Sequence, residues 1–84
     1  MSEPAERIID FILREIVRRP GVQIDVDTPL VSSGLIDSLA LVEILHQVAE
    51  VTNLRIPAGK VQARDMDTVR LMLATAARVG KPRQ

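Results

Sequence analysis

Apolar residues recur with the period of an α-helix in three stretches of the chain. The first runs from about residue 2 to 19, the second from 38 to about 52, and the third from 67 to about 79. On a wheel drawn at about 100° per residue, the apolar side chains of each stretch gather on one side, which is typical of a helix with a buried face. The pattern predicts an all-α fold, a small bundle of three main helices with a short fourth one.

The first predicted helix has clear start and stop signals. Ser2 can cap it, Pro4 is tolerated in its first turn, and Pro20-Gly21 should end it. Its apolar stripe consists of Ala5, Ile8, Ile9, Ile12, Leu13 and Ile16. The opposite face, which we expect to be solvated, carries Arg7, Asp10, Arg14 and Arg18.

Residues 22–37 show neither the helical nor the strand period. The segment is long for a loop, so we expect an ordered excursion that packs back on the bundle. Asp27-Thr28-Pro29 can cap one short turn, and Ser32-Ser33-Gly34 predicts another. The loop is anchored by apolar residues, which are Val22, Ile24, Val26, Leu30 and Leu35. It delivers Asp37-Ser38 to the start of the second helix.

The second predicted helix is the most apolar one and should end at about Thr52, followed by Asn53. One broad arc of it holds Ala40, Leu41, Val42, Ile44, Leu45, Val48, Ala49 and Val51. An arc this wide is typical of a central helix with neighbours on several sides. Leu39 lies outside this apolar arc, because the helical wheel places it on the polar side with Glu43 and His46. An exposed leucine should therefore lie beside Ser38.

The last part of the chain predicts an extended link at Leu54, Ile56 and Pro57, and a weak helical turn around residues 58–63. Asp67 should cap the last helix with Thr68 in its first turn. The buried side of that helix should hold Val69, Met72, Leu73, Ala76 and Ala77. Residues 80–84 should be a frayed tail. We expect a single domain over residues 1–84, with an ordered core over about 4–79.

Composition and charge exclude several classes of protein. The chain has 84 residues, no cysteine, one aromatic residue and a formal net charge of zero. A balanced charge and a lone Phe11 argue against nucleic-acid binding. No apolar run is long enough to cross a bilayer, and Met1 to Glu6 does not form a signal peptide. We expect a soluble, cytoplasmic monomer without disulfides or thiolate metal sites.

Enzymatic activity has little support in the sequence. A nucleophilic Ser38 would need a base, and the only histidine, His46, lies eight helical residues away, or about 12 Å along the axis. Asp37 is adjacent in sequence but does not face Ser38 on a helix. His46 and Glu50 could share a cation, yet two ligands are weak evidence for a metal site. We predict a protein that is not an enzyme and holds no metal.

Asp37-Ser38 permits two interpretations. The first is a structural helix cap, which these two residues alone would favour. In the second, Ser38 carries a phosphate ester at the point where helical N–H groups lack partners and the helix dipole is positive. Leu39 supports the second interpretation, because a cap does not need an exposed apolar neighbour.

The sequence resembles the acyl carrier proteins and their relatives, the peptidyl and aminoacyl carrier proteins. The similarity covers most of the chain and consists of Asp37-Ser38-Leu39 followed by Val42, Glu43 and Leu45, then Ile56-Pro57, and a last helix that opens at Asp67-Thr68-Val69. The resemblance implies that Ser38 receives 4′-phosphopantetheine from a phosphopantetheinyl transferase. It also implies that Asp37 helps this transferase to place its metal and substrate.

The resemblance further implies that the arm's thiol carries an acyl or aminoacyl group as a thioester, loaded by an activating ligase and passed to acyl-processing enzymes. Partner enzymes would contact a face made of Leu39, Val42, Glu43 and His46. Fatty-acid carriers usually have a strongly acidic second helix and an acidic turn after Ile-Pro, whereas this chain has Gly59, Lys60 and Arg64 there.

The placement of Gly34-Leu35-Ile36 resembles that of D-alanyl and other stand-alone aminoacyl carriers. We therefore favour a carrier of amino acids or short acyl groups, with fatty-acid and polyketide carriers as the alternative. An alternative from another functional class is a helical adaptor protein, in which Ser38 is an unmodified helix cap. A short acyl chain could also be sheltered in the aliphatic core next to the second helix.

Overall fold

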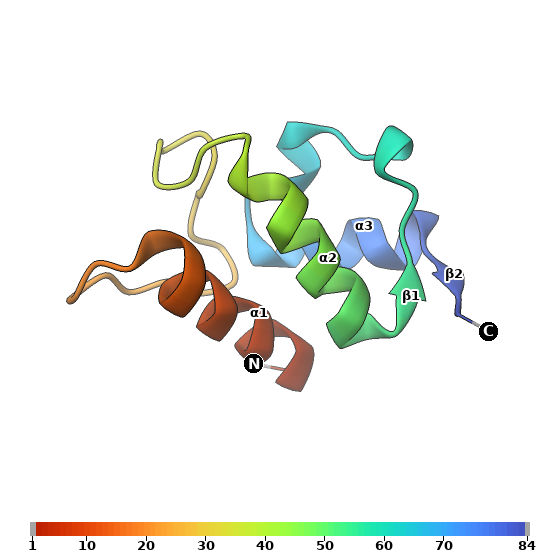
Figure 1. Ribbon diagram of the computed structural model, residues 1–84, viewed down its shortest axis with the longest axis horizontal. Coiled ribbons are helices and arrows are strands. Elements are labelled where there is room, and N and C mark those ends of the chain that lie inside the picture. Colours follow the sequence, from red (N-terminus) through yellow and green to blue (C-terminus); the bar gives the residue numbers. More distant parts are fainter. Residues whose placement is uncertain (1, 84) are drawn as a thin grey trace.

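The computed structural model describes residues 2–83 and shows three α-helices joined by long connections (Figure 1). Helix α1 (Glu3–Phe11) continues into a π-helical segment, η1 (Ile12–Val17). Helix α2 (Ala40–Thr52) follows the long loop, and helix α3 (Val69–Val79) comes after two short 3-10 turns, η2 (Ala58–Lys60) and η3 (Ala63–Met66). The predicted all-α bundle with a long loop between its first two helices is confirmed.

The first helix starts as predicted and ends earlier than predicted. The Ser2 hydroxyl accepts a hydrogen bond from the Ala5 N–H at 3.3 Å. The helix ends at Val17, where Arg18 adopts a left-handed conformation with φ of 57° and donates its N–H to the Leu13 carbonyl at 3.2 Å. The end is thus made by a widened last turn, whose hydrogen bond spans five residues, and not by Pro20-Gly21.

Helix α2 packs against both α1 and α3, and α1 also contacts α3. The largest side chains that are almost fully enclosed are Ile8, Ile12, Leu30, Ile44, Val48, Val69 and Met72. Within α2 only Ile44 and Val48 are buried, while Val42 is 61% exposed. The predicted apolar arc of α2 is therefore too wide, because the helix has neighbours on two sides and solvent along the side that holds Val42.

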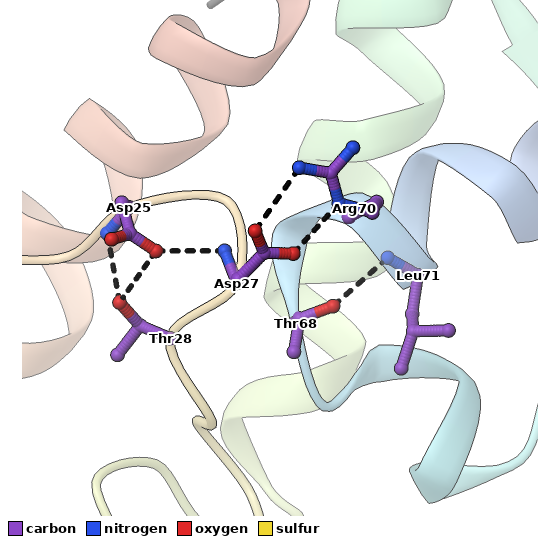
Figure 2. Close-up of polar contacts among 6 residues, drawn as sticks. All are labelled: Asp25, Asp27, Thr28, Thr68, Arg70 and Leu71. Carbon is purple, nitrogen blue, oxygen red and sulfur yellow. Dashed lines mark hydrogen bonds and ion pairs between the residues drawn. The ribbon is translucent and has the colours of Figure 1, made fainter.

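The long loop packs on the bundle as an ordered excursion. Ile24 and Leu30 are buried as predicted, and Ile36, which was not counted among the anchors, is buried too. The Asp25 carboxylate accepts hydrogen bonds from the Asp27 N–H at 2.8 Å and from the Thr28 hydroxyl at 3.2 Å (Figure 2). Asp25 therefore stabilises the first turn of the loop, in place of the predicted cap at Asp27.

Helix α3 is capped by Thr68 and not by Asp67. The Thr68 hydroxyl accepts a hydrogen bond from the Leu71 N–H at 3.0 Å (Figure 2). The helix begins one residue later than predicted, and the Asp67 carboxylate bonds to the long loop instead. Val69, Met72 and Ala76 are buried as predicted, together with Thr75, which the apolar pattern missed; Ala77 was predicted to be buried and is exposed.

The end of the chain is paired rather than frayed. Strands β1 (Leu54–Arg55) and β2 (Lys81–Pro82) form a two-stranded antiparallel sheet, seen beside the end of α3 in Figure 1. Gly80 lies so close to the strand that a Cβ atom there would overlap the Ala76 carbonyl oxygen and approach Leu54 Cδ1 to 2.9 Å. The predicted tail therefore folds back on the bundle as far as it is described, and Gln84 lies outside the described residues.

The connection between α2 and α3 contains two 3-10 turns, η2 and η3, where the sequence predicted one weak turn around residues 58–63. In the second turn, the Asp65 carboxylate accepts a hydrogen bond from the Gln62 N–H at 2.9 Å. None of the helices in residues 2–83 combines the length and the apolar character needed to span a membrane.

Candidate functional site

Ser38 lies in the exposed turn that leads into α2. Asp37, Ser38 and Leu39 all have exposed side chains, and Leu39 is 83% exposed. The Ser38 carbonyl accepts a hydrogen bond from the Leu41 N–H at 3.3 Å, so the helical hydrogen bonding starts at Ser38 although the regular helix starts at Ala40. The sequence thus placed Ser38 correctly at the entrance of the second helix.

The cap of this helix is Asp37. Its carboxylate oxygen Oδ1 accepts a hydrogen bond from the Ala40 N–H at 3.0 Å, which satisfies one of the helical donors that lack a partner at this end. The Ser38 hydroxyl has no hydrogen-bond partner among residues 2–83. The interpretation of Asp37-Ser38 as a structural cap is therefore correct for Asp37 and wrong for Ser38, whose side chain is exposed.

The start of α2 fits a group attached through phosphate. The Ala40 N–H is occupied by Asp37, whereas the N–H groups of Ser38 and Leu39 have no partner within the described part of the chain. A phosphate ester on Ser38 would meet these two donors at the positive end of the helix dipole. The start of the helix can therefore stabilise the negative charge of the phosphate by itself, without a basic side chain nearby.

One groove lies beside the exposed turn, and another lies further along α2, against the turns η2 and η3. The first has a volume of about 300 Å³ and is lined by Glu15, Ile16, Leu35, Ile36, Asp37, Leu39, Ala40 and Glu43. It therefore carries three carboxylates, one of which comes from the end of the first helix. The second groove, of about 150 Å³, is mostly apolar and is lined by Leu41, Val42, Leu45, Ala58, Val61, Gln62, Ala63 and Met66.

The residues predicted to contact partners share one exposed face of α2. Leu39, Val42, Glu43 and His46 are spaced three or four residues apart, which places them side by side on a helix. All four are exposed, and Leu39 and Val42 are two of the three large apolar side chains that are exposed in residues 2–83. Their exposure leaves them accessible, and their contact with a partner stays a prediction.

The described residues place neither the histidine nor a metal-binding cluster beside Ser38. His46 lies two helical turns further along α2, and in residues 2–83 there is no group of three or more His, Asp or Glu side chains placed to hold a metal ion. Sequence reasoning missed two residues near this turn. Glu15 contributes to the acidic groove, and Asp67 fixes the loop before Ser38. Glu15 and Asp67 lie far in sequence from the residues that they approach, and the local pattern of apolar and polar residues gives no signal for such contacts.

Comparison with known proteins gives one match. Residues 7–75 match the family model described as the phosphopantetheine attachment site. No curated protein and no solved structure matches the chain. The matched stretch extends from α1 to α3 and includes the exposed turn at Ser38. The chain therefore belongs to the phosphopantetheine attachment family, the helical carrier proteins that bear 4′-phosphopantetheine covalently on a serine.

Proposed function

We propose that Ser38 is the serine that receives 4′-phosphopantetheine, and that the protein tethers an acyl or aminoacyl group and presents it to partner enzymes. The observation that carries this proposal is the exposed hydroxyl of Ser38 at the positive end of α2, inside the matched segment and without a hydrogen-bond partner in residues 2–83. The arm supplies a terminal thiol for thioester formation. This chain contains no cysteine, so it has no thiol of its own.

The neighbours of Ser38 have separate roles in this proposal. Asp37 holds the start of α2 through the Ala40 N–H and leaves its other carboxylate oxygen to the transferase and its metal. Leu39 and Val42 offer an apolar contact to the transferase, to the activating ligase and to later enzymes, flanked by Glu43 and His46. The chain contributes no acid, base or nucleophile to the later chemistry and acts as a carrier.

Incubation with coenzyme A, Mg²⁺ and a broad-specificity phosphopantetheinyl transferase tests the attachment site. Intact-protein mass spectrometry should show the mass of one arm added to the wild-type chain and none added to Ser38→Ala. Ser2→Ala is the matched control, since it removes another exposed serine at a helix start and should load normally. An unmodified wild-type protein with several transferases, or a modified Ser38→Ala, would contradict the proposal.

We propose amino acids or short acyl groups as the cargo. The groove beside Ser38 carries Glu15, Asp37 and Glu43, and an ammonium group of an aminoacyl thioester would find opposite charge there. Helix α2 itself carries only two acidic residues, Glu43 and Glu50, so docking driven by a strongly acidic helix is not favoured.

A fatty-acid or polyketide carrier is the second candidate, and the apolar groove between α2 and the turns η2 and η3 is the observation in its favour. The two candidate functions can be distinguished by loading the protein with an aminoacyl arm or with a medium-chain acyl arm and comparing the amide chemical shifts of the two forms. Amide chemical shifts should change at Glu15 and Glu43 for the aminoacyl form, because that groove is acidic. Larger changes at Leu45 and Ala63 with the acyl arm would favour the second candidate and a sheltered chain.

A further inference from the structure

One carboxylate, that of Asp67, accepts all the side-chain hydrogen bonds that residues 30–32 of the long loop make to the segment before α3. Asp67 Oδ1 accepts hydrogen bonds from three consecutive N–H groups, those of Leu30 at 3.2 Å, Val31 at 2.8 Å and Ser32 at 2.8 Å. Asp67 Oδ2 accepts a fourth from the Ser32 hydroxyl at 2.8 Å. The arrangement is that of a helix N-cap in which the capping residue lies 35 to 37 residues away in sequence.

The turn fixed by Asp67 extends almost to Ser38. The Leu30 N–H also donates to the Asp67 carbonyl at 2.7 Å, and the Leu30 carbonyl accepts from the Ile36 N–H at 3.1 Å. Leu30 and Ile36 are both buried, so the two ends of this turn are anchored in the core. Gly34 closes it with a positive φ of 79°. Residues 30–36 therefore form one closed turn that ends two residues before Ser38.

Ser38 is thus placed by two independent constraints. On one side Asp37 ties it to α2 through the Ala40 N–H at 3.0 Å. On the other side the closed turn ends at the buried Ile36. Asp67 takes part only in the second constraint, because its carboxylate bonds to residues 30–32 and does not touch Ser38.

We propose that Asp67 is a positioning residue for the modification of Ser38, because its carboxylate holds the turn of residues 30–36 in the shape that a phosphopantetheinyl transferase binds. The inference rests on the proposed attachment at Ser38. A transferase that docks on the exposed turn gains affinity when this segment is already ordered, since no ordering cost is left to be met on binding. Loss of the carboxylate should therefore weaken docking more than it slows the chemical step.

A second polar tie between the loop and α3 provides the control. Arg70 donates two hydrogen bonds to Asp27, from Nε to Oδ1 at 2.7 Å and from Nη2 to Oδ2 at 3.1 Å (Figure 2). This pair joins the loop to α3, but it lies before the turn of residues 30–36 and makes no hydrogen bond to that turn. Asp27→Asn thus removes a carboxylate tie between the loop and the region around the start of α3, and it removes no hydrogen bond of the turn itself.

The experiment measures steady-state transfer from coenzyme A, with Mg²⁺ and a phosphopantetheinyl transferase, to wild type and variants. Asp67→Asn should raise the KM for the carrier about tenfold while kcat stays within about twofold. Ser32→Ala, which removes only the bond to Oδ2, should raise the KM less, and Asp27→Asn should leave it within about twofold. The amide protons of Val31 and Ser32 should move upfield in Asp67→Asn and keep their positions in Asp27→Asn, since only the first variant removes their charged acceptor.

The outcomes separate this inference from the proposed function. A wild-type protein that is not loaded would overturn the proposed function and this inference together. A loaded wild type with an unchanged KM in Asp67→Asn would overturn this inference alone. An equal rise of KM in Asp67→Asn and Asp27→Asn would also overturn it, because general destabilisation would then explain the effect.

Discussion

Asp37 and Ser38 are adjacent residues with different tasks. The Asp37 carboxylate caps α2 by accepting the Ala40 N–H, whereas the Ser38 hydroxyl is exposed and free of hydrogen bonds within residues 2–83. The helix cap and the proposed attachment site are thus divided between neighbouring side chains. Ser38 can be modified without loss of the helix start, because the cap does not depend on its oxygen.

Substitution of each residue by alanine should separate these tasks. Asp37→Ala should lower the free energy of unfolding by about 1 kcal/mol, the usual cost of a lost N-cap. Ser38→Ala should change it by less than about 0.5 kcal/mol, as for a surface residue without partners. Urea unfolding followed by circular dichroism measures both values, and a larger cost for Ser38→Ala than for Asp37→Ala would contradict the assignment of the cap.

At the scale of elements, the end of α3 is tied to the start of the link after α2. Gly80 donates its N–H to the Ala76 carbonyl at 2.8 Å, and the chain then pairs Lys81 with Arg55 and Pro82 with Leu54. Arg83 adds an ion pair with Glu50 at 3.5 Å. The small sheet therefore joins the ends of α2 and α3 at the side of the molecule away from the Ser38 turn (Figure 1).

Gly80→Ala should loosen this junction. The added methyl group would overlap the Ala76 carbonyl oxygen and press on Leu54, and an inserted methyl in a closely packed place costs about 1–3 kcal/mol. Urea unfolding measures the loss of stability, and hydrogen exchange at β1 and β2 locates it. Gly59→Ala is the control, since a Cβ at Gly59 has no atom within 4 Å; equal costs for the two variants would contradict the close approach at Gly80.

At the scale of the whole molecule, carboxylates tie the long loop to α3 and to the residues just before it. The pKa of Asp67 is lowered by the hydrogen bonds from Ser32, Val31 and Leu30, and the pKa of Asp27 is lowered by the hydrogen bonds and charge of Arg70. Both groups have an ordinary value of 3.8. Because the folded protein holds them in the charged form, the unfolded chain binds protons first when the pH falls.

The free energy of unfolding should therefore depend on pH in the acidic range. A depressed pKa in the folded state contributes stability that is complete above about pH 5 and is lost as the pH falls through 3.8 toward the lower folded values. Urea unfolding at pH 7, 5, 4 and 3 measures this decline. The double variant Asp27→Asn, Asp67→Asn should be less stable at pH 7 and show a flatter decline; the same slope as in wild type would contradict the assignment.

Local features of this protein could be predicted from the sequence. The three helical stretches, the Ser2 cap, the left-handed Asn53 at the end of α2 and the position of Ser38 all follow from residues within a turn or two of one another. Helical periodicity and capping depend on contacts between positions i and i+3 or i+4, which the chain order itself supplies. The sequence also showed the absence of a thiol.

The tertiary structure decided everything that depends on which distant groups meet. Asp67 and Thr68 are both good caps in the sequence, and only the approach of residues 30–32 assigns Thr68 to α3 and Asp67 to the loop. Val42 is exposed because the turns next to it leave an open groove beside α2, and Lys81 and Pro82 form a strand because Leu54 lies within reach. A polar group or an apolar side chain finds its partner by proximity in space, and that proximity is created only when the helices pack.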